Sequence, residues 1–128
     1  MDNNIILPED FYTSYFYTGS SVICNPPVTN TDIDIMFLTD DKKIFEQELT
    51  EDSWYACGED DYVGIVGDVW SAWKKGKLNY LVTDNQEYYD QFFAATKDAI
   101  EQNLLVKDDR IKLFNKYLAK FKKDLTPK

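Results

Sequence analysis

Two aspartates, Asp32 and Asp34, stand at the start of an apolar run and constrain any fold that this chain can adopt. The run TDIDIMFLT, residues 31–39, alternates polar and apolar residues and then becomes wholly apolar, which predicts a strand that enters the core. Because side chains at i and i+2 of a strand point to the same face, the two carboxylates should lie side by side. Burying an unpaired pair costs on the order of several kcal/mol, so the fold must supply a counter-charge such as a divalent cation. The alternative is a half-exposed strand whose outer face carries two acids.

A Gly-Ser turn precedes this strand. Residues 13–17, TSYFY, are β-branched and aromatic, which predicts a strand that stops at Gly19, and Ser20 or Ser21 can cap a short helix after it. The backbone N–H groups and a hydroxyl at such a turn can bind phosphate. Mg²⁺ (or Mn²⁺) is usually bound together with substrate phosphates. Gly19, Ser20 and Ser21 are therefore candidate phosphate-binding residues, beside a metal held by the aspartate pair.

The rest of the chain predicts further strands followed by two helices. Residues 41–49 favour a surface helix, 58–68 a loop rich in Gly and Asp, and 69–84 a hairpin with its turn at 75–77. Because strands come first and helices follow, the order predicts an α+β fold: a small mixed β-sheet with two C-terminal helices packed on one face. The length predicts a single domain over residues 1–128.

Both C-terminal helices are expected to be amphipathic. Thr83 or Asp84 can cap the first, and Asp108 or Asp109 opens the second. The expected buried positions are Tyr89, Phe93, Thr96 and Ile100 in the first helix, with Tyr88, Phe92 and Ala95 beside them, and Ile111, Phe114, Leu118 and Phe121 in the second.

The composition excludes several classes of function. The chain has no histidine, which excludes Ser-His-Asp and Cys-His catalysis and the usual zinc sites. Residues 1–68 carry 15 acidic residues and 2 lysines, a balance of −13, whereas residues 69–128 carry 12 basic and 8 acidic residues, a balance of +4. The first half should therefore repel nucleic acid unless cations bridge the contact, while the second half can offer a small basic face to an anion.

The cysteines and the hydropathy bear on the compartment. Cys24 and Cys57 form no CxxC pair, so a reduced intracellular protein is the simpler interpretation, with one disulfide as the alternative. No stretch approaches a membrane span, and the first residues lack a signal-like pattern. We therefore expect a soluble, cytoplasmic protein with no membrane partner.

The spacing of the motifs resembles that of a known family. Gly19-Ser20, eleven intervening residues and then Asp32-Ile33-Asp34-Ile35 resemble the signature of the polymerase-β-type nucleotidyltransferase superfamily. Residues 74–118 are similar to the C-terminal part of short nucleotidyltransferase-like proteins of tailed phages, which implies the host cytoplasm as the location if this chain is phage-encoded. The resemblance implies a nucleotidyltransferase fold that binds an NTP. In it the aspartates hold catalytic metal, the Gly-Ser turn holds the β- and γ-phosphates, and an acceptor hydroxyl attacks the α-phosphate to release pyrophosphate.

Two residues depart from that family pattern. Thr18 precedes the glycine where the family prefers a hydrophobic residue, and Asn79 stands where active members place a third carboxylate. That acid commonly helps to activate the attacking hydroxyl, whereas asparagine cannot act as a base and ligates metal less well. Asn79 is therefore the third candidate catalytic position, and we expect transfer to be weak or lost while nucleotide binding is kept. Asp84, the nearest later acid, is interpreted as a helix cap.

Three functions are compatible with these residues. The first is a nucleotidyltransferase acting on an RNA or protein hydroxyl, in which Lys74, Lys75 or Lys77 neutralises phosphate charge or simply lies in a solvated turn. The second is a catalytically degenerate protein that binds a nucleotide or a host protein. The third is a small antitoxin-like nucleotidyltransferase that modifies a partner toxin. A binding role would use exposed aromatic residues as interface anchors, and the candidates for this role are Trp54, Trp70 and Trp73.

Overall fold

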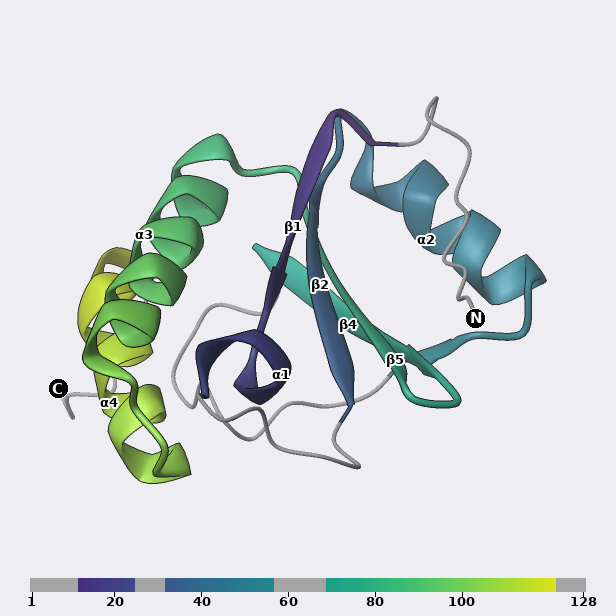
Figure 1. The fold of residues 1–128 in the computed structure, drawn as a ribbon. Helices are drawn as coiled ribbons and strands as arrows, with labels where there is room; N and C mark the ends of the chain where they lie inside the picture. The colour runs from purple at the N-terminus through teal and green to yellow at the C-terminus, as the bar shows by residue number, and fades with distance from the viewer. Residues whose placement is uncertain (1–11, 25–31, 57–68, 122–128) are drawn as a thin grey trace, which may run out of the picture.

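The computed structural model describes residues 12–24, 32–56 and 69–121. Among these residues, five strands form one mixed sheet in the order β1-β2-β5-β4-β3, with helices on both of its faces (Figure 1). The α+β class and the mixed sheet are as predicted, whereas the expected loop at 58–68 and Cys57 lie outside the described residues. The strands are β1 (Ser14–Thr18), β2 (Ile33–Leu38), β3 (Tyr55–Ala56), β4 (Trp70–Lys75) and β5 (Leu78–Thr83), and the helices are α1 (Ser20–Ile23), α2 (Lys42–Glu51), α3 (Gln86–Gln102) and α4 (Lys107–Tyr117).

Strand β2 lies inside the sheet and determines where its polar residues fall. It runs antiparallel to β1 and parallel to β5, with Asp34 opposite Asn79 in the parallel pair. The predicted hairpin is present, because β4 and β5 pair antiparallel on either side of a turn at Gly76 and Lys77. The two-residue strand β3, which pairs with β4, was not predicted from the sequence.

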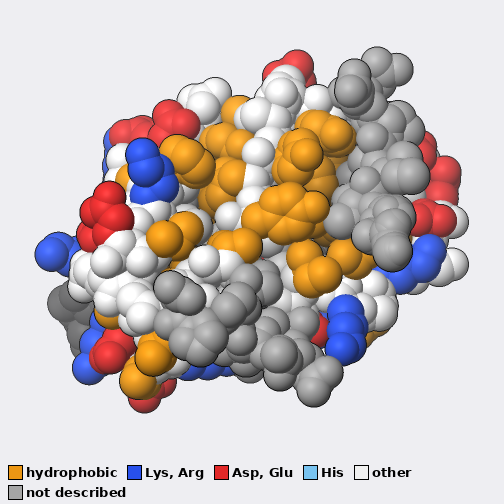
Figure 2. Space-filling view, in the orientation of Figure 1, with side chains coloured by type: hydrophobic (Ala, Val, Ile, Leu, Met, Phe, Trp, Pro, Cys, Tyr) orange, Lys and Arg blue, Asp and Glu red, His pale blue; other side chains and the backbone are white. Residues whose placement is uncertain are grey.

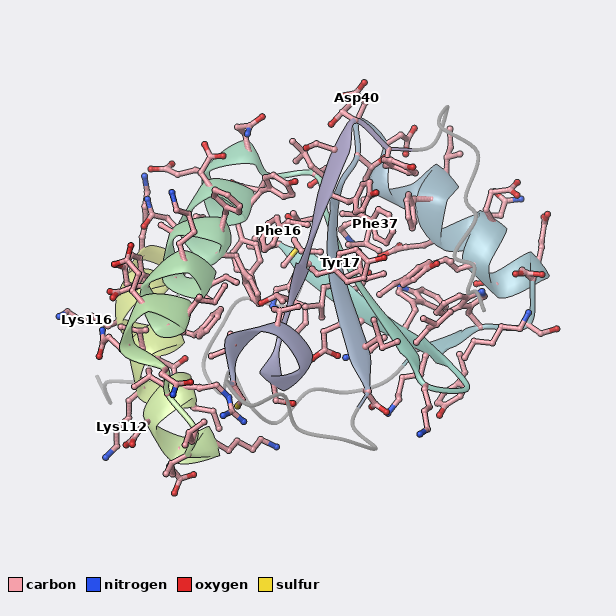
Figure 3. The ribbon with its side chains drawn as sticks, viewed as in Figure 1. Phe16, Tyr17, Phe37, Asp40, Lys112 and Lys116 are labelled. Carbon is pink, nitrogen blue, oxygen red and sulfur yellow. The ribbon has the colours of Figure 1, made fainter. Side chains whose placement is uncertain are left out.

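The two faces of the sheet carry separate apolar cores. Figure 3 shows Phe16 pointing toward α3 and Phe37 toward α2. Both C-terminal helices cover one face, as predicted, and α2 covers the other. The core on the α3 side comprises Ile23, Met36, Trp70, Ala72, Leu81, Tyr88, Phe92, Ala95, Ala99, Phe114, Leu118 and Phe121. The core on the α2 side comprises Ile35, Phe37, Phe45, Leu49, Trp54, Tyr80 and Val82.

Aromatic rings fill the core on the α2 side. The Tyr80 ring lies 4.1 Å from that of Trp54 and 4.7 Å from that of Phe37, measured between centroids. Burial raises the pKa of the Tyr80 hydroxyl well above its ordinary value. Trp54 and Trp70 are both buried, so these two tryptophans are core residues and not interface anchors, while Trp73 is half-buried.

The caps of the two long helices differ from those predicted. Asn85 caps α3, because its side chain accepts a hydrogen bond of 2.9 Å from the backbone of Tyr88. Thr83 is buried and donates to the Val69 carbonyl at 2.6 Å, so it holds the strand end to β4. Helix α4 begins at Lys107 after Val106, one residue earlier than expected, which leaves Asp108 and Asp109 in its first turn.

The buried face of α3 is rotated from the predicted one. Tyr88, Phe92 and Ala95 are fully buried, whereas Phe93 and Ile100 are exposed. The apolar stripe of this helix is wide, since aromatic residues occur in adjacent pairs, and only packing against the sheet and α4 selects the inner member of each pair. No helix within the described ranges has the length and apolarity to cross a bilayer.

Candidate functional site

Four polar residues lie in one row across the sheet, at the N-terminal end of β2. The strand register places Thr18 opposite Asp34, Asp34 opposite Asn79, and Asn79 opposite Lys74. Because successive side chains alternate between faces, all four share the face that α3 covers further along the sheet. We call these residues the polar row: Thr18, Asp34, Asn79 and Lys74.

Asp34 and Asn79 are in direct contact. The Asn79 side-chain amide donates a hydrogen bond of 3.0 Å to Oδ1 of Asp34. Both side chains are half-buried, so the contact lies at the border between the core and solvent. The fold therefore brings Asn79 beside Asp34, although the two residues lie more than forty positions apart in the chain.

Gly19 lies against the same carboxylate. Its φ is +81°, in the region that L side chains rarely adopt, and a Cβ there would lie 2.1 Å from Oδ2 of Asp34. A side chain at this position would therefore displace the aspartate. Gly19 is also the N-cap of α1, with no side-chain cap, so the prediction that Ser20 or Ser21 caps this helix is wrong. Ser20 and Ser21 instead form its first turn.

Asp32 lies one residue before β2 and makes an ion pair with Lys74, which comes from β4. The Asp32 side chain is 39% exposed and that of Lys74 is 29% exposed. The pair was not anticipated, because three lysines crowd this hairpin and only the strand register distinguishes them. Lys75 instead donates to the Asp52 carbonyl at 2.8 Å, and Lys77 is exposed in the turn.

Buried contacts fix the Gly-Ser turn from both sides. At the end of β1, the hydroxyls of Thr18 and Thr96 share a hydrogen bond of 2.8 Å, which holds the strand to α3. After α1, the Arg110 guanidinium donates to the buried Cys24 thiol at 3.2 Å and to the Leu104 carbonyl at 2.9 Å. Cys24 is a free thiol. Thr18, the departure from the family pattern, thus has a structural partner on α3.

The donor set limits the kind of cation that the site can hold. Within the described ranges, no group of three or more His, Cys, Asp or Glu side chains gathers in one place. The site offers two carboxylates and one amide, and Lys74 already balances one of these carboxylates. Mg²⁺ is often bound by only one or two carboxylates together with substrate phosphates. The residues therefore fit a cation that arrives with a phosphorylated ligand better than a resident metal ion.

Comparisons with protein-family models, with curated proteins and with solved structures gave no match to this chain. The function is therefore inferred from the geometry of the site and from the motif spacing.

Proposed function

We propose that this protein is a nucleotidyltransferase-fold protein that binds an NTP together with Mg²⁺ or Mn²⁺. The supporting observation is the contact of Gly19 with Asp34, since it joins a turn suited to phosphate with a carboxylate suited to the metal that phosphate carries. A strand that merely carried acids on its outer face would have no need of a glycine at positive φ against one of them.

Each residue of the site has a distinct role in this proposal. Asp32 and Asp34 hold the cation, and the backbone of Gly19, Ser20 and Ser21 holds the β- and γ-phosphates. The cation neutralises phosphate charge when it is bound. Lys74 contributes a second positive charge, because release from Asp32 on cation binding leaves its ammonium group available to phosphate oxygens.

Transfer of a nucleotidyl group would require one further function, the removal of a proton. The oxygen of an acceptor hydroxyl would form a bond to the α-phosphorus, the bond to pyrophosphate would break, and the hydroxyl proton would pass to a base. Asn79 cannot accept that proton. The acceptor on this proposal is an RNA or protein hydroxyl, and transfer is slow.

A second candidate function is nucleotide binding without transfer. Two observations favour it: an amide occupies the place beside Asp34, and a lysine neutralises Asp32, so the net charge of the three ionised groups is −1. Such a site attracts one divalent cation much more weakly than a cluster of three carboxylates would. The protein would then act by holding a nucleotide, or a host protein in a nucleotide-dependent way.

The test combines binding and transfer on the same samples. Each of the four NTPs is titrated into the full chain by calorimetry with Mg²⁺, with Mn²⁺ and with EDTA. The same NTPs, labelled at the α-phosphate, are then incubated with RNA and protein acceptors. Binding that requires the cation supports the proposed function. Label in an acceptor selects the transferase, and its absence selects the second candidate.

Asp34→Ala provides the variant and Asp40→Asn the matched control. Asp40 is an exposed acid just beyond the opposite end of β2, where Figure 3 labels it. Asp34→Ala and Asp32→Ala should each abolish cation-dependent NTP binding with the fold intact by circular dichroism, whereas Asp40→Asn should bind as the wild type does. Unchanged, cation-dependent binding in the Asp32→Ala/Asp34→Ala double variant would show that the metal site has been misassigned.

A further inference from the structure

Within the part of the chain that the structure describes, β1 is an edge strand, and it lies in an uncharged segment. Among the described residues, β1 is the first strand in the sheet order, so within these ranges only β2 pairs with it. Half of the backbone N–H and C=O groups of such a strand point away from its neighbour. Residues 12–20, YTSYFYTGS, contain no charged residue, although the chain as a whole has a net charge of −9. Edge strands are usually protected by charged side chains, proline or a bulge, and β1 has neither charge nor proline.

Apolar side chains flank this edge on both faces of the sheet. Tyr15 and Tyr17 are 49% and 44% exposed on the α2 side. On the α3 side, Phe16 packs edge to face against Tyr89 and against Phe93, at 5.1 and 5.0 Å between ring centroids, and Phe93 is itself 43% exposed. Figure 2 shows hydrophobic side chains on both sides of β1, with the charged side chains mostly at the periphery of this view. The edge therefore offers backbone partners and apolar contacts together.

The sequence of this edge is nearly symmetric about Phe16. On either side stand Tyr15 and Tyr17, and beyond them Ser14 and Thr18. If two copies of β1 pair antiparallel about Phe16, then Phe16 lies opposite Phe16 of the second copy and Tyr15 opposite its Tyr17. A two-fold interface requires this kind of self-complementarity. Aromatic pairs directly opposite each other are among the favourable cross-strand pairs.

We propose that β1 pairs with β1 of a second copy of this chain, which forms a dimer with a continuous sheet across the two-fold axis. The charge distribution favours a second copy over a basic partner, because a basic partner would be recognised by acidic side chains and this edge has none. The pairing uses the backbone of β1 and does not use the Asp34 side chain, which lies on β2. The proposal is thus independent of whether the protein binds nucleotides.

Sedimentation equilibrium of the full chain over a range of concentrations tests the pairing, with hydrogen exchange of the β1 amides on the same samples. We expect the mass of two chains at high concentration, and slower exchange of the outward β1 amides as concentration rises. A wild-type protein that stays monomeric at the highest concentration, with outward β1 amides exchanging at the rate of an open edge, would overturn the proposal. That result would leave an extended segment of another protein as the occupant of this edge.

A pair of double variants tests the register. Tyr15→Lys/Tyr17→Lys places lysine opposite lysine twice across the axis and should weaken the dimer at least about tenfold. Tyr15→Lys/Tyr17→Glu places lysine opposite glutamate twice and should recover most of that loss. Tyr55→Lys, at an exposed tyrosine of β3, is the matched control and should leave the dimer unchanged. Circular dichroism checks that each variant folds. A dimer that is insensitive to the double lysine variant, or that is weakened equally by both double variants, would show that the chains do not pair in this way.

Discussion

Two rows of residues on the same face of the sheet, only two positions apart along each strand, differ in polarity and, for most members, in exposure. Three members of the polar row, Asp34, Asn79 and Lys74, are partly exposed at the N-terminal end of β2, whereas Thr18 is buried. The next row on that face consists of Phe16, Met36, Leu81 and Ala72, and we call it the apolar row. Met36 is fully buried and Leu81 is 6% exposed, whereas the Lys74 side chain is 29% exposed.

The apolar row helps to specify the fold, whereas the polar row can carry chemistry. A one-residue slip of β2 against β5 would exchange the side chains that β2 presents to the two cores. The packing of the apolar row on one face, together with that of Ile35 and Phe37 on the other, therefore fixes the register. The polar row then acquires its alignment from the neighbouring row, and Thr18 is its one buried member. Its residues can therefore be chosen for binding, and substitutions in the two rows should have separable effects.

The largest expected effect is on transfer rate, in Asn79→Asp. The change adds a carboxylate beside Asp34 in a nearly isosteric side chain, and a positioned general base typically contributes about 10²- to 10⁴-fold in rate. Any transfer by the wild type should rise by a factor in this range, measured as label transferred from an NTP. Asn79→Ala, which removes the amide without adding a base, is the control and should not gain activity.

The same variant should become sensitive to pH and metal. Two carboxylates in contact raise the pKa of one of them in the folded state above its unfolded value. Asn79→Asp should then be as stable as the wild type at acidic pH and lose stability as pH rises toward neutrality, and Mg²⁺ should restore it. Denaturation midpoints at several pH values, with and without Mg²⁺, measure this. A midpoint that does not respond to Mg²⁺ would place the added carboxylate away from the metal site.

The second effect concerns stability and the apolar row. Met36→Ala removes a fully buried side chain from the centre of the α3-side core and should lower the free energy of unfolding by about 2–5 kcal/mol. Urea denaturation measures the loss, and Asp34→Ala gives the comparison two positions away on the same strand. Where the folded state remains populated, Met36→Ala should keep its NTP affinity, and Asp34→Ala should lose it with a small change in stability. If Asp34→Ala lost as much stability as Met36→Ala, the proposed separation of the two rows would be wrong.

The sequence predicted which segments form strands and helices better than it predicted how these elements pair and pack. The strand expected at 13–17 is Ser14–Thr18, and the apolar run at 31–39 contains Ile33–Leu38, because alternation and β-branched content are local signals. The contact of Asn79 with Asp34 depends on a parallel pairing between distant segments, which no local pattern encodes. The side of α3 that is buried, the ion pair of Lys74 with Asp32 and the short strand β3 depend on the same long-range packing.

The third effect tests the close approach at the turn. Gly19→Ala should lower stability because φ +81° and ψ −174° are essentially restricted to glycine, which costs on the order of 1–3 kcal/mol, and should lower it further because the new Cβ must displace Asp34. Gly76→Ala gives the cost of an alanine at a positive φ without a clash, since that glycine has φ +60° and nothing within 4 Å of an added Cβ. The excess loss in Gly19→Ala should shrink in an Asp34→Ala background, because the clashing carboxylate is gone. Equal losses in the two alanine variants would mean that the turn relaxes away from Asp34.

The smallest expected effects are those of Lys74→Met, and the direction of its change in Mn²⁺ affinity is the informative result. The Lys74–Asp32 pair is partly exposed, so its loss should change stability by no more than about 1 kcal/mol. Because the cation must compete with the lysine for Asp32, the variant should bind Mn²⁺ alone several-fold more tightly than the wild type. It should bind the NTP complex less tightly, since the phosphates lose a positive charge. Lys75→Met, whose lysine contacts Asp52 instead, is the matched control and should change neither affinity.

Titration of Mn²⁺ by electron paramagnetic resonance, followed by NTP titration, separates the two affinities. Weaker Mn²⁺ binding in Lys74→Met would mean that the lysine supports the metal site instead of competing with it, and that the polar row is organised around Lys74 and not around a cation.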